Sequence, residues 1–143
     1  MTKNKNDEVL LIGLPNSGKS SLVNALCGKK VSIIGSTPNT TRDKVSATIK
    51  RENKVFEISD LPGYLEDPDE LNEKFQTKLR GYLDAAKVIM FVIDVNTTNF
   101  SGLDKIHNLL QKNTTKNQKV ITVFNKCENF KKFELNSELY KYI

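Results

Sequence analysis

Histidine and cysteine are scarce in this sequence, and long apolar runs are absent. The only histidine is His107, and the two cysteines are Cys27 and Cys127. Two isolated cysteines match no zinc-binding spacing and are typical of a reducing compartment. The longest apolar run, Val88 to Ile93, is far shorter than the roughly 20 residues that cross a bilayer. Residues 1–8 are polar and mixed in charge, so we expect no signal peptide and a cytoplasmic location.

The composition is that of one globular domain. The chain has 143 residues, of which 38% are hydrophobic and 27% charged, and this balance allows one hydrophobic core. The net charge of +5 leaves association with RNA or the ribosome open. Scattered, solvated lysines explain it more simply, because no dense basic block alternates with aromatic residues. We therefore predict a single domain over residues 1–143, with residues 1–7 as a flexible N-terminus.

Strand and helix patterns alternate along the chain. Continuous apolar runs predict buried parallel strands at residues 9–12, 88–93 and 120–124. Period-two alternation predicts a hairpin of residues 44–50 and 54–59, turning at residues 51–53. Helical spacing predicts helices at residues 20–26, at 71–86 and after Ser101 as N-cap, and an irregular helix in the tail at 130–140. This order predicts an α/β fold with a mostly parallel sheet between helices.

Residues Gly13 to Ser20 read G-L-P-N-S-G-K-S and match the phosphate-binding pattern G-x-x-x-x-G-K-[ST]. The match lies between a predicted buried strand and a predicted helix, where backbone N–H groups and the helix N-terminus can face a phosphate. Lys19 would reach the β- and γ-phosphates, and the Ser20 hydroxyl would bind Mg²⁺. A chance glycine-rich turn does not explain this context.

Two further loops follow predicted strands. Asp60-Leu61-Pro62-Gly63 places an acid where it can hold Mg²⁺ through water, and the Gly63 N–H can contact a γ-phosphate. Taken alone, this sequence is an ordinary turn signal. In Asn125-Lys126-Cys127-Glu128, the Asn side chain can bond a purine edge, and Glu128 can accept the paired N–H donors of guanine. The Lys126 stem can lie along the base, although a charged surface loop is the alternative.

The ordered motifs resemble the translation-factor-related P-loop GTPases, most closely the branch with Era, EngA (Der), MnmE and the G domain of FeoB, over residues 8–128. Thr37 to Asp43 resembles the switch I of this branch, which implies that Thr41, or otherwise Thr40, senses Mg²⁺. The resemblance implies a three-layer P-loop NTPase fold that binds GTP or GDP with Mg²⁺. The residues that it implies for binding Mg²⁺ are Ser20, Thr41 and Asp60. The nucleotide-binding set is Pro15, Asn16, Ser17, Gly18, Lys19, Ser20, Ser21, Gly63, Asn125, Lys126 and Glu128.

The same resemblance suggests a catalytic set of Lys19, Thr41 and Asn16. In this branch, a P-loop asparagine helps hold a K⁺ ion that offsets charge between the β- and γ-phosphates, and Asn16 occupies that position. The alternative is that Asn16 only shapes the loop. Arg42 is then the next candidate for stabilising the charge.

Three departures from the family pattern affect the functional hypothesis. The fourth motif ends in Glu128 instead of Asp, Tyr64 stands where Ras-like proteins place a water-positioning Gln, and no S-A-[KL] motif follows. No pattern for the usual last strand and last helix follows either, so we expect a C-terminally short domain that self-associates or is completed by a partner chain. The two hypotheses are a slow GTPase acting as a nucleotide-gated switch and a non-catalytic interaction module.

Overall fold

The computed structural model describes residues 7–27, 32–34, 45–60, 73–128 and 137–143. Six strands in this part form one sheet with the order β2-β3-β4-β1-β5-β6. The strands are β1 (Asp7–Gly13), β2 (Ser32–Ile34), β3 (Val45–Arg51), β4 (Lys54–Asp60), β5 (Val88–Asp94) and β6 (Lys119–Asn125). The helices are α1 (Lys19–Cys27), α2 (Glu73–Ala85) and α3 (Phe100–Asn113), with a 3₁₀ helix, η2 (Ser137–Tyr142).

The four strands β4, β1, β5 and β6 form the parallel part of the sheet. β1 pairs in parallel with β4 and β5, and β5 pairs in parallel with β6. β3 is antiparallel to β4 and to the short edge strand β2. The predicted mostly parallel α/β sheet is therefore confirmed, and so is the hairpin, which turns at Glu52 and Asn53 because Arg51 still pairs with Lys54. β2 was not predicted, since three residues are too few to show a period.

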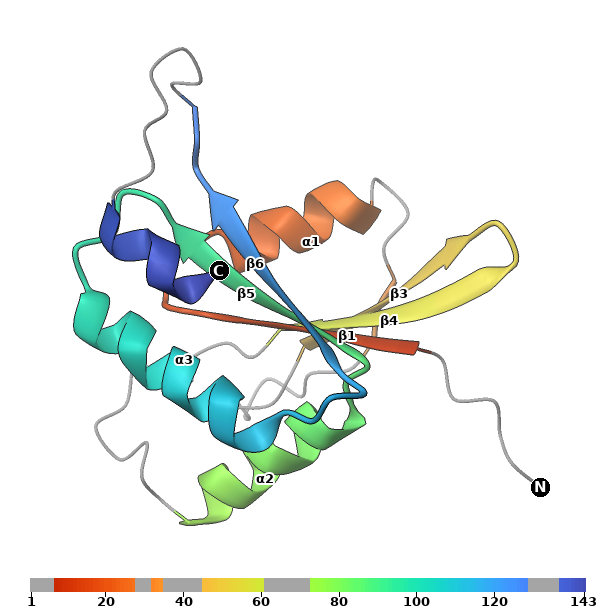
Figure 1. Cartoon of the computed structure of the whole chain (residues 1–143). Coiled ribbons are helices and arrows are strands. Elements are labelled where there is room, and N and C mark those ends of the chain that lie inside the picture. Colours follow the sequence, from red (N-terminus) through yellow and green to blue (C-terminus); the bar gives the residue numbers. More distant parts are fainter. Residues whose placement is uncertain (1–6, 28–31, 35–44, 61–72, 129–136) are drawn as a thin grey trace.

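Helices cover both faces of the sheet, which makes three layers (Figure 1). α2, α3 and η2 bury apolar side chains against one face, and the main core lies there around Phe91 and Ile93 of β5. On the other face, Leu22 and Val23 of α1 pack against a smaller cluster centred on Leu11 and Val92. The predicted stripe of α3, which consists of Leu103, Ile106 and Leu110, is buried. No helix in the described residues is long and apolar enough to cross a membrane.

The N-cap of α3 differs from the prediction. The helix begins at Phe100, and the Asn99 side chain accepts a hydrogen bond from the Gly102 N–H at 3.0 Å. Ser101, the predicted N-cap, lies inside the first turn and is exposed. The helix starts earlier because Phe100 packs against the main core and because asparagine caps at least as well as serine.

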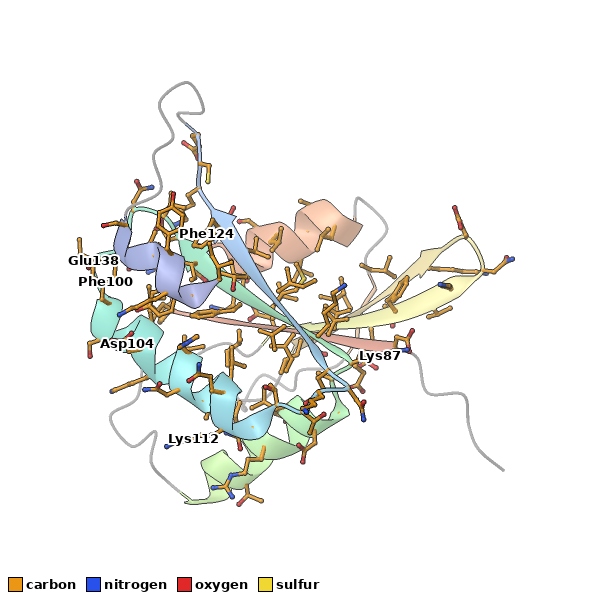
Figure 2. The ribbon with its side chains drawn as sticks, viewed as in Figure 1. Lys87, Phe100, Asp104, Lys112, Phe124 and Glu138 are labelled. Atoms are coloured by element: carbon orange, nitrogen blue, oxygen red, sulfur yellow. The ribbon has the colours of Figure 1, made fainter. Side chains whose placement is uncertain are left out.

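The C-terminal tail closes one edge of the main core. Residues 129–136 lie outside the described residues, so the predicted irregular helix is seen only as η2. Leu139 and Tyr142 of η2 are buried. The Tyr142 hydroxyl donates a hydrogen bond of 2.6 Å to Asp104 Oδ1. Asp104 lies on the part of α3 that is next to η2 (Figure 2). The His107 ring stands edge-on to the Tyr142 ring at 5.4 Å, so this histidine packs at the contact between α3 and η2.

Candidate nucleotide-binding site

The predicted site residues that the structure describes lie at or just after the carboxyl ends of neighbouring parallel strands, where Asp94, which was not predicted, also lies. Asp60 ends β4, Gly13 ends β1, Asp94 ends β5 and Asn125 ends β6. The register pairs Gly13 with Val92 and Asp94 with Asn125, so these ends lie side by side. Ligands of open α/β sheets bind at this edge, where the loops that follow the strands converge.

The loop after β1 needs its glycines because other chain segments lie directly against it. A Cβ on Gly13 would overlap the Val92 carbonyl, and one on Gly18 would overlap the Asn125 side-chain amide. Gly18 has φ of 93°, which side chains other than glycine rarely adopt. Asn16 also has a positive φ of 64°. The loop then enters α1 with a hydrogen bond from Leu22 N to Gly18 O, so the helix N-terminus directly follows the loop.

Lys19 places a positive charge inside this loop. Its side chain is buried, and Nζ donates to the carbonyl oxygens of Gly13 at 3.0 Å and Leu14 at 2.9 Å. A buried ammonium is costly unless it is paired or hydrogen-bonded. This arrangement suits an anionic ligand that takes over some of those contacts.

Ser20 and Asp60 bring two oxygen donors together from separate elements. The Ser20 hydroxyl lies 3.4 Å from Asp60 Oδ2, and Asp60 is buried. Hydroxyl and carboxylate oxygens are donors that Mg²⁺ prefers, so these residues fit the expected metal. Thr41 and Gly63, which were predicted for the same site, lie outside the described residues, as does Tyr64. The described residues contain no cluster of three or more His, Cys, Asp or Glu side chains.

The loop after β6 is bonded directly to the loop after β1. The Asn125 amide donates to the Ser17 carbonyl at 3.0 Å, and Lys126 Nζ donates to the Asn16 carbonyl at 2.5 Å. These partners are 108 and 110 residues apart in sequence. Glu128 is exposed and Cys127 is partly buried. The folding of the sheet thus joins two motifs that were predicted separately.

Sequence reasoning missed Asp94. Its Oδ2 lies 3.4 Å from Lys126 Nζ, and its Oδ1 accepts a hydrogen bond from Asn96 N at 2.9 Å. The signal was available, because an acid at the end of a predicted strand is also the argument that selected Asp60. Unlike Asp60, Asp94 lies outside every recognised motif of the sequence.

A cavity of about 280 Å³ lies beside the loop after β1, between that loop and the start of α3. None of the residues Asn125 to Glu128, which were predicted to recognise the base, lines this cavity. Its lining consists of Leu14, Pro15, Asn16, Ser17, Val92, Asp94, Thr97, Asn99 and Leu103.

Comparison with known families agrees with this geometry. The model of the family described as 50S ribosome-binding GTPase matches residues 8–126, which is most of the chain. The chain belongs to this family. The predicted resemblance to Era, Der and FeoB proteins is thereby confirmed.

Curated relatives of this GTPase domain include several Der proteins. The chain is 36% identical to GTPase Der of Lachnoclostridium phytofermentans over 126 residues, which cover 87% of this chain and 28% of that protein. It is 32% identical to GTPase Der of Mycoplasmoides gallisepticum over 133 residues, covering 93% of this chain and 29% of that protein. The chain therefore spans under a third of the length of these relatives.

Two solved structures of GTP-binding proteins are similar to this chain. The G domain of the T. maritima FeoB iron transporter matches with a TM-score of 0.63 and 27% identity, covering 97% of this chain and 83% of that one. The nucleolar GTP-binding protein 1 from Plasmodium falciparum matches with a TM-score of 0.65 and 19% identity, covering 99% and 74%. The second likeness concerns the fold alone.

Proposed function

We propose that this GTPase domain binds GTP and GDP with Mg²⁺ and hydrolyses GTP slowly, acting as a nucleotide-gated switch. The observation that carries the proposal is the pair of hydrogen bonds from Asn125 and Lys126 to the carbonyls of Ser17 and Asn16. They hold the base-recognition loop against the phosphate loop. A nucleotide has its base and its phosphates at the two ends, so one ligand would span both loops.

Each part of the nucleotide has proposed partners among these residues. Lys19 and the backbone N–H groups of the loop after β1 hold the phosphates, and Ser20 and Asp60 hold Mg²⁺. When bound, Mg²⁺ neutralises phosphate charge. Asn125 and Glu128 bond the guanine edge, and the Lys126 stem lies along the ring. The remaining proposed contacts are Pro15, Ser17, Gly18, Ser21 and Gly63 for the phosphates, with Thr41 joining Mg²⁺ only in the GTP state.

Nucleotide titration tests the binding proposal. Fluorescent GDP should bind more tightly than the matching ADP analogue, and Lys19→Ala should abolish binding because the phosphates lose their main cation. The Lys112→Ala variant, which alters an exposed lysine at the end of α3, should bind as the wild type does. Equal affinity for the two bases would leave a P-loop protein without guanine specificity.

Potassium activation through Asn16 is the proposed route of hydrolysis. Asn16 is exposed at the rim of the phosphate loop, where its side chain can reach a cation next to bound phosphates. A cation there would offset negative charge that builds on the leaving oxygen. Multiple-turnover phosphate release should rise when K⁺ replaces Na⁺. Asn16→Ala should remove that rise and spare GDP binding, and identical rates in both salts for both proteins would exclude this role.

A non-catalytic interaction module is the second candidate, favoured by the exposed Glu128 in place of the usual aspartate. Such a module would release no more than one phosphate per protein molecule under multiple-turnover conditions. Association with the ribosome or RNA is compatible with either function. It is supported by the family description and by the net charge of +5. Co-sedimentation with large ribosomal subunits, compared between GTP and GDP, tests it.

A further inference from the structure

Asp94 and Lys126 form an ion pair at the junction of the two proposed nucleotide loops. The sheet register places Asp94 opposite Asn125, so Lys126 follows directly beside the end of β5. Lys126 Nζ contacts Asp94 Oδ2 at 3.4 Å and donates to the Asn16 carbonyl at 2.5 Å. One ammonium group therefore links the ends of β5 and β6 to the phosphate loop.

The backbone around this ammonium is held in an unusual conformation. Both Asn16 and Lys126 have φ of 64°, in the left-handed region that residues other than glycine rarely adopt. Such conformations persist when the surrounding structure holds them, and they concentrate at functional sites. The hydrogen bond from Lys126 Nζ joins these same two residues, so it helps to maintain both.

Asp94 is itself fixed by the backbone around it. Oδ1 accepts from Asn96 N at 2.9 Å, and the Asp94 carbonyl accepts from Thr97 N at 3.0 Å. Val95 N donates to the Asn125 carbonyl at 3.1 Å, which ties this turn to the end of β6. With Oδ1 facing the backbone, Oδ2 is directed at Lys126. These backbone contacts therefore orient the carboxylate toward Lys126.

We propose that Asp94 is a positioning residue for nucleotide binding. It orients Lys126 and balances its charge, so that the ammonium stays on the Asn16 carbonyl while the aliphatic stem faces the base. The inference rests on the proposed function and adds a residue that no motif of the chain includes. Asp94 acts through Lys126 and makes no contact with the nucleotide in this proposal.

The test is a double-mutant cycle read out as GDP dissociation. Asp94→Asn keeps an oxygen for the Asn96 N–H and removes the charge that faces Lys126. The pair is partly exposed, with 40% and 24% of the two side chains accessible, so we expect GDP dissociation to quicken only about threefold to fivefold. In a Lys126→Met background, the same substitution should cause no further change. Asp104→Asn, which removes a second ion pair with Lys141 on α3, should leave dissociation unchanged.

Two outcomes overturn the proposal. One is unchanged dissociation in Asp94→Asn, and the other is an equal acceleration in the Lys126→Met background, which would mean that Asp94 acts independently of Lys126. A wild-type protein without guanine-nucleotide binding would instead contradict the proposed function. In that case the amide resonance of Ser17, whose nitrogen is bonded to the Asn16 carbonyl carbon, is measured in the nucleotide-free protein. Asp94→Asn should shift it more than Asp104→Asn does, and equal shifts would overturn the positioning role.

Discussion

Among single residues, Glu128 is the departure from the family pattern with the most direct chemical consequence. Its side chain is exposed at the end of the loop that Asn125 and Lys126 hold against the phosphate loop. One additional methylene moves the carboxylate by more than an ångström relative to aspartate. Charged hydrogen bonds depend strongly on distance, so under the proposed function the longer side chain would bond the guanine edge less well.

We expect Glu128→Asp to tighten GDP binding about threefold to tenfold, a change of roughly 1 kcal/mol. Binding of the ADP analogue should not change, because adenine lacks the paired donors that the carboxylate accepts. Glu128→Gln keeps the length and removes the charge, and it should weaken GDP binding. Calorimetric titration of the three proteins checks this. Weaker GDP binding by the aspartate variant would mean that the loop is adapted to glutamate.

On the scale of secondary-structure elements, the start of α3 depends on Asn99. Its side chain accepts the Gly102 N–H, which would otherwise lack an intrahelical partner. Asn99→Ala should lower the free energy of unfolding by about 1 kcal/mol. Ser101→Ala is the matched control and should be close to neutral, because Ser101 is exposed within the helix. Chemical denaturation measures both, and a larger loss in Ser101→Ala would restore the original N-cap prediction.

The docking of η2 on α3 has a pH dependence set by three groups. The hydrogen bond from Tyr142, followed by that from Lys141, holds the pKa of Asp104 below its ordinary value of 3.8. Burial, followed by the bond to Asp104, raises the pKa of Tyr142 above 10.0. The hydrogen bond with Asp104 raises the pKa of Lys141 above 10.5. The contribution of Asp104 to the free energy of unfolding is present above about pH 4 and is lost as the pH falls. The contributions of Tyr142 and Lys141 are lost only above about pH 10.

Asp104→Asn should therefore melt at a lower temperature than the wild type at neutral pH. The difference should shrink as the pH falls from about 7 to about 2, because the wild-type carboxyl then becomes protonated. Thermal melts across this range provide the measurement. Asp84→Asn changes another exposed acid, at the end of α2, and should show no such trend. A melting difference for Asp104→Asn that does not vary with pH would contradict this account.

For the whole molecule, the feature that bears on association with other chains is the exposed edge of the sheet. β6 is the last strand in the described sheet, and it exposes Val120 and Ile121 by 42% and 38%. Edge strands with exposed apolar residues tend to pair with other chains. We therefore propose that this edge mediates self-association or binds a partner chain, while η2 closes the core on the α3 side.

Sedimentation velocity at increasing concentration tests self-association. The wild type should associate, and Ile121→Lys should shift the population toward the monomer, because a lysine on an edge strand opposes pairing. Leu26→Lys is the control, since Leu26 is similarly exposed at 45% but lies on α1. A wild-type protein that stays monomeric and melts sharply at high concentration would mean that the tail completes the core by itself.

Much of the fold and part of the site followed from local sequence. The strands near residues 9–12, 88–93 and 120–124 were predictable because each is a continuous apolar run, and the structure extends each by one to three residues at its ends. The predicted burial was wrong for the third strand, because β6 lies at the edge of the described sheet and none of its residues is buried. The loop from Gly13 to Ser20 was predictable because its chemistry lies in consecutive residues. The order of strands and helices was enough to predict a mostly parallel sheet.

Other features depended on contacts between distant residues, which no local pattern records. Asn99 caps α3 because Phe100 reaches the core, and Tyr142 is buried because it meets Asp104 across 38 residues of sequence. The bonds of Asn125 and Lys126 to the phosphate loop, and the pairing of Lys126 with Asp94, exist because β1, β5 and β6 end side by side. Sequence alone determined the order of the motifs, and from them the residues that we propose for phosphate and base binding. Tertiary structure decided which of them touch, since side chains meet only where the sheet brings their strands together.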